Sequence, residues 1–468
     1  YLRDGKENSN GGTLRISEVT SSNSTALKKT EKVGAYPTKD ELCRAWAGCI
    51  IVNAEENNAC DTAVEVTVTD NAGNSRTETL ALDIDNTAPT VDLVFDNNTF
   101  VNEKYYNAKR TATLTFTERA HHFDRAAAEK NIVITAKDFN GADVKDAYDI
   151  SWKENVNYNA PDASSFVATI NFLKDANYTL TVAEENNPNV GYTDKAGNTA
   201  GSVKTEFTVD TKDPTGVVTI NENKWTKFLG AITFGLYSNS EANVSISSED
   251  ETSPVKIEYA VTDASEPADL EKLDFAEYTG PFSFDKDKQF DVYARITDYA
   301  GHQIVINSDG YIVDKQAAAD LSLSAEEKTN ENGIYNISNI GHYTVDGKAV
   351  FGIKVNINVN ESKAMTDDVE VYSGIKSIEY KVTSTEENVK KVTQSGTLYS
   401  FDYTRDGKEN SNSGKLKISE VESYETTVPT VKFEKAGAYP KKDQLLTEWG
   451  GAIIVDAEKN NSSDTVVE

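Results

Sequence analysis

One short phrase returns three times in this chain and constrains its fold more than any other feature. It reads TDNAGN at 69–74, TDKAGN at 193–198 and TDYAGH at 297–302. Before and after each phrase, apolar and polar residues alternate, a pattern typical of half-buried strands. The phrase itself supplies Asp and Gly, which favour a tight turn because Asp bonds nearby backbone groups and Gly tolerates a positive φ. The sequence therefore predicts three β-hairpins closed by the same kind of turn.

A short linker follows each predicted hairpin. The strand after the turn ends on an aspartate in every copy, at Asp85, Asp210 and Asp314. The first two linkers continue as DNTAP and DTKDP, and their prolines break a β-ladder and stiffen the exit. The third linker reads DKQAA and lacks the proline. Each hairpin is therefore predicted to be the last of a domain and to lead into a tether.

The tethers divide the chain into four parts. Residues 1–86 are predicted to be the C-terminal part of one domain, and 87–212 and 213–316 to be complete domains. Residues 317–468 are predicted to be the N-terminal part of a larger domain of the same type as 1–86, with an insertion. About seven short strand-like runs per 100 residues fit two packed antiparallel sheets. The expected fold class is all-β, with β-sandwiches in tandem.

The two ends of the chain repeat one another. YLRDGKENSNGG at Tyr1 returns as YTRDGKENSNSG at Tyr403, and GAYPTKDEL at Gly34 returns as GAYPKKDQL at Gly437. The offset grows by one residue between these two pairs, which indicates a one-residue insertion. We therefore expect the chain to be one period of a tandem array plus a short overlap, cut within a domain at both ends.

The repeated motifs resemble those of a known group. TDxAGN followed by DxTAP, together with IEYxV strands at Ile257 and Ile378, is similar to the bacterial immunoglobulin-like (Big-type) domain repeats of large Gram-positive surface proteins and adhesins. The resemblance covers nearly the whole chain. It implies immunoglobulin-like β-sandwiches joined by short linkers in an elongated array. The third copy departs from the pattern, because His302 stands where the family has Asn and the closing Pro is missing.

The resemblance also implies a function and a location. The chain is expected to be a structural repeat of a giant bacterial cell-surface fibre or adhesin stalk, extracellular, which projects and spaces a distal binding region. Its partners are then the neighbouring repeats of the same chain. A fold of this kind does not fix a ligand.

Other roles stay open at this point. In a self-assembling extracellular filament or surface layer, truncated domains are completed by a neighbour's strands. In a glycan- or host-binding adhesin module, binding is first sought in the insertion at 384–450, because loops on a rigid sandwich often carry function. In a multidomain enzyme these domains are spacers. The chain itself is not expected to be an enzyme, since it has no phosphate-binding loop, GxSxG elbow or HExxH motif.

Charge narrows the range of partners. The formal net charge is -29 at pH 7, so nucleic acid and anionic membrane surfaces would repel the chain. No run of 18 apolar residues occurs, so no membrane insertion is expected in this segment. An acidic chain of this kind attracts cations instead.

Acidic side chains flank the turns and tethers. They are Asp70, Asp85, Asp194, Asp210, Asp213, Asp298 and Asp314. Hard oxygen ligands gathered at a domain junction can hold Ca²⁺ and stiffen the joint, so these residues are candidate calcium ligands. The alternative is that they cap turns by accepting bonds from backbone amides. No cofactor is required by the sequence, and Ca²⁺ is the one cofactor that it suggests.

Two further groups of residues are candidates for chemistry. His121 and His122 lie near Glu118 and Asp124, and all four are metal-ligand types. An exposed loop that opens a short helical turn is the expected explanation, and a metal site is the alternative. The cysteines are Cys43, Cys49 and Cys60, which the second copy replaces by Leu446, Ala452 and Ser463. A disulfide is therefore not required by the domain, although one pair can form in this copy.

The segment Ala35–Trp46 is predicted to be a short helix. Pro37 suits an early helical position, and Thr38 with Glu41 has the spacing of a capping box. Leu42 and Trp46 then share one face and are expected to pack on a sandwich.

Overall fold

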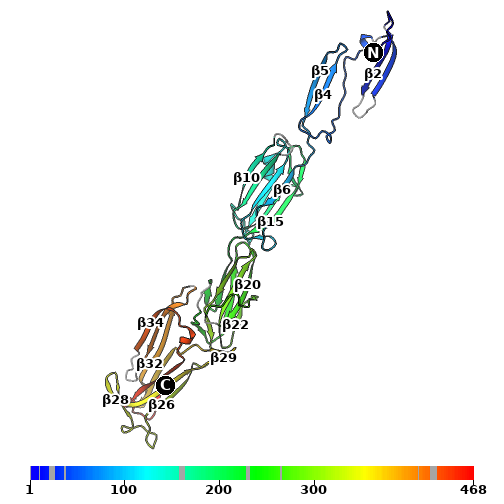
Figure 1. The fold of residues 1–468 in the computed structure, drawn as a ribbon. Coiled ribbons are helices and arrows are strands. Elements are labelled where there is room, and N and C mark those ends of the chain that lie inside the picture. The colour runs from blue at the N-terminus through cyan, green and yellow to red at the C-terminus, as the bar shows by residue number, and fades with distance from the viewer. Residues whose placement is uncertain are drawn as a thin grey trace.

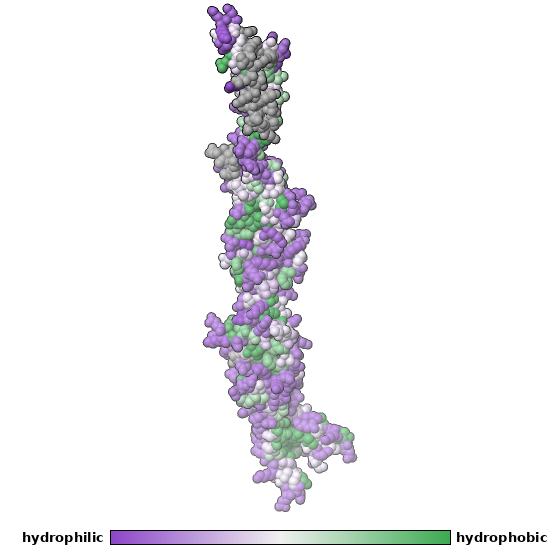
Figure 2. Space-filling model, turned by 90° about the vertical axis from the view of Figure 1, so that its right-hand side faces the viewer, coloured by the Kyte–Doolittle hydropathy of each residue, from purple (hydrophilic) through white to green (hydrophobic). Residues whose placement is uncertain are grey.

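The computed structural model describes residues 2–9, 11–19, 27–35, 38–157, 164–227, 232–263, 266–408, 410–421 and 430–468. Its regular structure is almost entirely β, which confirms the predicted fold class. The domains follow one another along a rod, and the two termini lie at opposite ends (Figure 1). The visible face is mostly hydrophilic, with hydrophobic residues in small groups along the rod (Figure 2). Among the described residues, no helix has the length and apolar character needed to cross a bilayer.

The second domain is a complete two-sheet sandwich. One sheet has the order β10-β11-β8-β6 and the other has the order β7-β15-β12-β9. Its elements are β6 (Thr90–Phe95), β7 (Tyr105–Tyr106), β8 (Thr111–Thr117), α1 (Arg125–Asn131), β9 (Ile132–Lys137), β10 (Tyr148–Asn155), β11 (Ser165–Phe172), β12 (Ala176–Val182), β13 (Val190–Thr193), β14 (Thr199–Gly201) and β15 (Val203–Val209).

This strand order is that of the immunoglobulin fold. If the main strands are lettered in chain order, with β6 as A and β15 as G, one sheet holds A, B, E and D and the other holds C, F and G. Strand β7 runs parallel to β15 and closes the second sheet. The helical turn predicted after the paired histidines is confirmed as α1, whose N-cap is Asp124.

Strict alternation builds the core between these sheets. Along β8, Ala112, Leu114 and Phe116 are fully buried, and the threonines between them are half-buried. Strand β11 pairs with β8 and contributes Phe166 and Ile170 to the same core. Since successive side chains of a strand point to opposite faces, this pattern fixes which face of the sheet turns inward.

The third domain repeats the plan with fewer residues. Its sheets have the orders β17-β16-β19-β22 and β18-β25-β23-β20-β21, and β24 also pairs with β23. Strand β18 is parallel to β25, as β7 is to β15. The strands are β16 (Thr215–Ile220), β17 (Asn223–Trp225), β18 (Leu236–Ser238), β19 (Ala242–Glu249), β20 (Val255–Thr262), β21 (Ala276–Glu277), β22 (Phe282–Phe284), β23 (Lys288–Asp298), β24 (Gln303–Asn307) and β25 (Tyr311–Val313).

The fourth domain carries a long meander between its third strand and β35. Its sheets have the orders β26-β28-β27, with β35 beside β28, and β34-β33-β32-β31-β36. A separate hairpin joins β29 and β30. The elements are β26 (Ala319–Ala325), β27 (Gly341–Val345), β28 (Lys348–Glu361), β29 (Ala364–Thr366), β30 (Val369–Val371), β31 (Ser377–Glu386), β32 (Val389–Arg405), β33 (Ser413–Glu420), β34 (Thr430–Ala438), η3 (Lys442–Gln444), β35 (Glu448–Asp456) and β36 (Val466–Val467).

The first 86 residues contain two separate small sheets. Strands β1 (Leu2–Arg3), β2 (Gly11–Val19) and β3 (Leu27–Ala35) form one, and the hairpin of β4 (Thr62–Thr69) and β5 (Ser75–Leu82) forms the other. None of the three cysteines of this part forms a disulfide with another described cysteine.

The prediction of a helix at Ala35–Trp46 was wrong. Only the short 3-10 turn η1 (Lys39–Glu41) forms there, and residues 36 and 37 lie outside the described part of the chain. In the second copy, Trp449 is 8% exposed and belongs to β35, which pairs with β28. Tertiary pairing therefore places this segment in a sheet and overrides the local helix signals. In the first copy, Trp46 is 61% exposed, and the described residues of 1–86 contain no strand equivalent to β28.

The hairpin β4–β5 has the register of strands that would continue the pairing of β36 with β31. In the third domain, β20 pairs with β23, and Tyr259 stands opposite Ala294. Strand β31 carries the same IEYxV motif as β20, but β36 pairs with it only at Thr383 and Val382. By the repeat, Val64 is the counterpart of Val467. Continuing the ladder places Val66 opposite Tyr380 and Val68 opposite Ile378.

Exposed apolar residues on both parts agree with this match. In β26 of the fourth domain, Leu321 is 62% exposed and Leu323 is 42% exposed. Their counterparts in β16 of the third domain, Val218 and Ile220, are fully buried beneath a complete second sheet. On the hairpin, the exposed apolar side chains are Val66, Val68 and Leu80. The fourth domain therefore has a core that a hairpin of this sequence would cover.

We predict that appending the sequence of residues 66–89 after Glu468 stabilises the fourth domain. Each valine that becomes buried contributes about 1.5–3 kcal/mol, and each kcal/mol raises the melting temperature of a domain of this size by about 2–4 °C. Calorimetry measures the shift, and hydrogen exchange measures the protection of the β31 amides. The control extension carries lysine at both valine positions. An extended chain that melts like its control would contradict the register.

Candidate functional site: the joints between domains

The three joints between domains share one arrangement of acidic side chains. At each joint, the tether aspartate lies near an acid at the end of the second long strand of the next domain. The pairs are Asp85 with Glu118, Asp210 with Asp250, and Asp314 with Glu361. In every pair, one carboxylate raises the pKa of the other by charge repulsion. The joints are therefore sites of concentrated negative charge.

Burial adds to this repulsion. It is the main reason that the pKa of Glu118 is raised to about 7, that of Asp210 to about 6 and that of Glu361 to about 7. A carboxylate removed from water costs free energy unless a cation or hydrogen-bond donors compensate it. The raised pKa values mark positions where a bound cation would be favourable.

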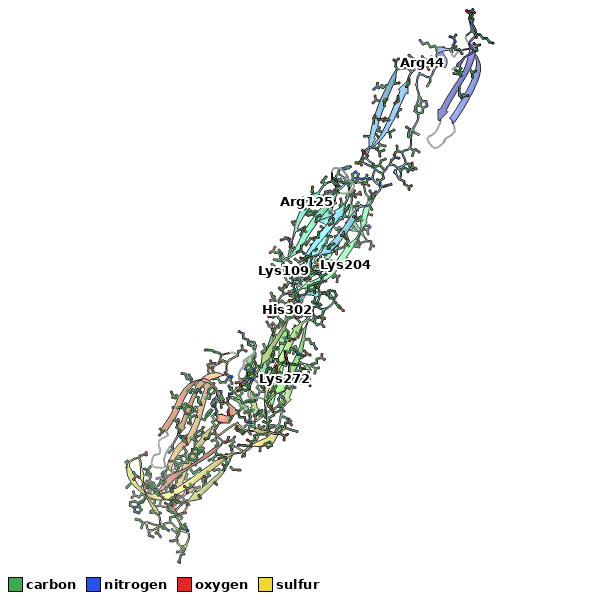
Figure 3. The ribbon with its side chains drawn as sticks, in the orientation of Figure 1. Arg44, Lys109, Arg125, Lys204, Lys272 and His302 are labelled. Carbon is green, nitrogen blue, oxygen red and sulfur yellow. The ribbon has the colours of Figure 1, made fainter. Side chains whose placement is uncertain are left out.

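The aspartates of the repeated turns join two of these sites. Asp298 accepts bonds from the backbone amide and ring of His302 at 2.8 Å and 2.9 Å. Ligand atoms of Asp210, Asp298 and His302 all lie within 4.8 Å of one another. Figure 3 shows His302 at the junction of the second and third domains. Asp194 holds Asn198 in the same way, and Asn198 donates to the backbone oxygen of Asp85 at 3.3 Å.

Arg119 connects the first and second domains. Its guanidinium donates to the backbone oxygens of Ile84 at 2.7 Å and Asn58 at 2.8 Å. It also lies 3.8 Å from the carboxylate of Asp85, and both side chains are almost fully buried. Hydrogen bonds from a charged donor are stronger than neutral ones. The first joint is therefore held directly by the side chain of the residue that follows Glu118.

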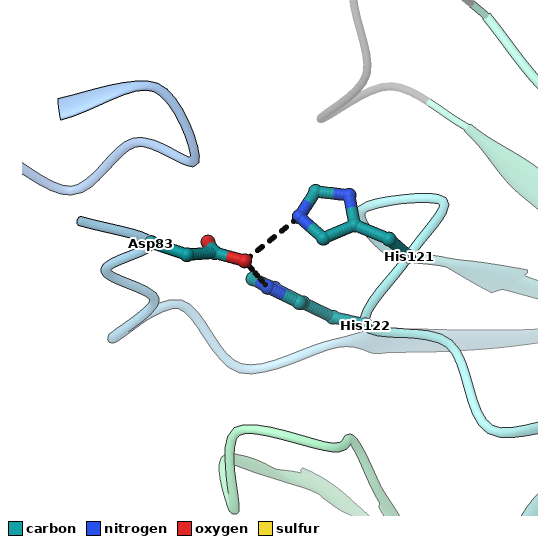
Figure 4. A group of neighbouring side chains, drawn as sticks. All are labelled: Asp83, His121 and His122. Atoms are coloured by element: carbon teal, nitrogen blue, oxygen red, sulfur yellow. Dashed lines mark hydrogen bonds and ion pairs between the residues drawn. The ribbon is translucent and has the colours of Figure 1, made fainter. Parts of the chain in front are cut away.

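The paired histidines also belong to the first joint. The Nε2 atoms of His121 and His122 lie 3.0 Å and 2.8 Å from one oxygen of Asp83 (Figure 4). On the other side of its ring, His122 Nδ1 lies 2.5 Å from Asp85. The aspartates stand on the segment after β5, and the histidines stand on the loop between β8 and α1. Of the predicted neighbours, Asp124 instead caps α1 by accepting a bond from Ala127 N.

Backbone bonds and rings hold the second joint. Phe139 N of the second domain donates to the oxygen of Glu251 in the third at 2.9 Å. Asn102 donates to the oxygen of Tyr299 at 2.8 Å, and the Tyr299 ring meets the Tyr105 ring edge to face. Direct bonds of this kind restrict bending between the domains.

The insertion of the fourth domain forms much of the third joint. The hydroxyls of Tyr439 and Tyr237 lie 2.5 Å apart across this joint. The amine of Lys442 donates to the side chain of Gln289 and lies 4.2 Å from the ring centre of Tyr372. Part of the segment 384–450 therefore packs against the third domain. Ligand binding by the segment 384–450 stays a prediction. It applies to the part of that segment that does not contact the third domain.

Two of the predicted calcium ligands lie away from these clusters. Asp70 accepts bonds from Ala72 N, Asn74 N and the Asn74 side chain within its own turn, and Asn74 lowers its pKa. Asp213 is exposed on the second tether. Sequence reasoning missed Asp250 and Glu361 as joint residues. Their place in the sequence could have revealed them, because each is the acidic residue at the end of a strand-like run in its domain.

Comparisons with known proteins give little further information. No family model matches the chain, and no curated protein matches it. Among solved structures, a tetra-tandem repeat in the extending region of a large adhesion protein is 16% identical with a TM-score of 0.28, over 95% of this chain and 92% of that one. The fibronectin(III)-like modules of Clostridium thermocellum CbhA are 9% identical with a TM-score of 0.16, over 48% of this chain and 94% of that one. TM-scores this low carry no argument.

We predict that Arg119→Ala loosens the first joint. Removing one partner of a buried ion pair leaves the other charge uncompensated and costs about 3–5 kcal/mol. Hydrogen exchange at the amides of Ile84 and Asn86 measures the loss. The matched control is Arg125→Ala on α1, because Arg125 is half-exposed and pairs with Glu129 at the surface. Equal exchange in the two variants would show that Arg119 does not hold the joint.

Proposed function

We propose that this chain is a structural repeat of the stalk of a giant bacterial cell-surface fibre or adhesin, extracellular, which projects and spaces a distal binding region. The observation that carries this proposal is the end-to-end order of sandwiches with direct bonds across every joint. Domains in such an array contact only their neighbours, so length grows with the number of repeats. The function is then reach and stiffness, without catalysis.

The joints decide how stiff such a stalk is. A tether of a few residues would bend freely if the domains on either side did not touch. Here the side chains of Arg119, Asn102 and Tyr439 cross the three joints and bond to the neighbouring domain. This supports a load-bearing or spacing role over a flexible linker.

Calcium is the cation that we propose for the carboxylate clusters at the joints. Ca²⁺ takes six to eight oxygen ligands from carboxylates, carbonyls and water. At the second joint, Asp210, Asp250 and Asp298 would provide the carboxylates. Binding would remove the repulsion between them and fix the angle between the second and third domains.

Small-angle scattering of the chain tests both parts of this proposal. A compact globule of this length would have a radius of gyration of about 23 Å, and we expect a much larger value. We further expect excess EDTA to make the particle more flexible and Ca²⁺ to reverse the change. The variant Asp298→Asn should lose part of the response, whereas Asp70→Asn, at the same position of a turn away from the clusters, should keep it. A compact particle would contradict the proposed stalk function. An extended particle whose scattering does not change with EDTA would contradict only the proposed calcium sites.

Self-assembly is a second candidate function, favoured by the match in register between β31 and hairpin β4–β5. Hairpin β4–β5 of another copy has the register to replace β36 beside β31, and the two complementary parts lie at opposite ends of the rod (Figure 1). Such a head-to-tail contact does not close and would produce a filament.

Sedimentation at increasing protein concentration tests this second candidate. We expect oligomers that Val66→Lys abolishes, since it places a charge in the core of the acceptor. Thr67→Arg should leave them intact, because Thr67 faces the other side and its counterpart in the third domain is Arg295. A strict monomer at every concentration, or oligomers that survive Val66→Lys, would contradict this assembly.

A further inference from the structure

We propose that Asp83, His121 and His122 form a binding site for a divalent transition metal of the zinc class, which links the first and second domains. The site adjoins the carboxylate pair of the first joint, because His122 contacts both Asp83 and Asp85. Only four histidines occur in the chain, and two of them converge here on one carboxylate oxygen (Figure 4).

The geometry of the three residues suits a metal ion. Their ligand atoms all lie within 4.8 Å of one another, and Asp83 Oδ2 is 3.0 Å and 2.8 Å from the two imidazole nitrogens. Zinc binds nitrogen and oxygen at about 2.0–2.2 Å in a tetrahedron, which separates neighbouring ligand atoms by about 3.3 Å. Only a small outward movement of side chains would admit the ion. A water molecule would complete the tetrahedron.

The surroundings of His122 point to the same conclusion. Its Nδ1 lies 2.5 Å from Asp85 Oδ2, and the Asp85 side chain is 1% exposed and lies beside Arg119. A histidine that ligates a metal commonly donates its other N–H to a carboxylate, which fixes the tautomer and the ring orientation. Asp85 would have this supporting role.

The contact between His122 and Asp83 is also a place where a cation can bind. If Nδ1–H donates to Asp85, the Nε2 of the neutral ring has a lone pair directed at Asp83 Oδ2. Two acceptors 2.8 Å apart repel one another unless a proton or a metal ion lies between them. A metal would satisfy both atoms, and His121 Nε2 would reach the same ion.

The ligand types select the kind of metal. Two imidazoles and one carboxylate suit zinc and related transition metals, whereas calcium prefers an all-oxygen shell. The site is also accessible, because the side chains of Asp83 and His121 are 43% and 46% exposed. A bound metal would join the segment after β5 to the loop before α1. It would thereby add a second tie across the joint that Arg119 already bridges.

Zinc titration by calorimetry, together with cobalt absorption spectroscopy, tests the proposal. The protein is the full chain with Cys43, Cys49 and Cys60 replaced by serine, because free thiols bind the same metals, and excess Ca²⁺ is present to occupy all-oxygen sites. We expect one zinc per chain and a tetrahedral cobalt spectrum. His121→Ala and Asp83→Asn should each weaken binding at least tenfold. Both residues are half-exposed, so neither variant should disturb the fold, which circular dichroism checks.

Two further variants make the test specific. His302→Asn removes the imidazole of the second joint and should leave zinc binding unchanged. Asp85→Asn should weaken it by about 10–100-fold, the usual effect of losing the carboxylate behind a metal-bound histidine. Absence of stoichiometric binding, or binding that survives both His121→Ala and Asp83→Asn, would overturn the proposal. Neither result depends on whether the chain is part of a stalk.

Discussion

Pairing between two strands organises the core of the third domain and begins in the same register in the fourth. One strand carries the IEYxV motif, and the other leads into the repeated TDxAG turn. Where both occur in one domain, as β20 and β23 do, Ile257 pairs with Ile296 and a complete core lies behind them. Where the second strand is only started, as at β36, the opposite sheet of the fourth domain has exposed leucines. The β4–β5 hairpin also has exposed valines, Val66 and Val68. The exposed apolar residues of the two parts therefore have matching positions in the same strand pairing.

The same turn connects the fold to the joints. Its aspartate, Asp194 or Asp298, must cap the turn for the hairpin to form, and the hairpin lies at the end of the sandwich that meets the preceding tether. The tether aspartate and the acid after the second long strand also lie near this turn, because the strands end at the same level of the sandwich. Burying several carboxylates together is costly without a cation. The repeated fold thus creates repeated sites that favour a positive charge, whether it comes from a side chain or from solution.

Local features were predictable from the sequence, and long-range pairings were not. The hairpins and tethers follow from alternation and turn residues that lie within a few positions of one another. Helix α1 follows from Asp124 and a run of alanines. By contrast, the segment that ends at Trp46 has helix signals, but in the second copy its place is set by β28, about 90 residues earlier in the chain. The meeting of His122 with Asp83 likewise depends on how two domains pack, so sequence spacing placed Asp124 beside it instead.

The three joints use different sources of positive charge, which has consequences for the whole rod. The first has Arg119 and two histidines, and the second has His302 beside Asp210 and Asp298 together with Lys212, which pairs with Glu251. At the third, Arg405 lies 3.5 Å from the fully buried Asp309, and burial lowers the pKa of Lys442 to about 8. At the third joint, the insertion therefore provides the cationic side chains Arg405 and Lys442, and Tyr439 packs beside them. The joints therefore differ in how much of their buried negative charge their own side chains compensate, so the stiffness of each joint should respond differently when dissolved cations are removed.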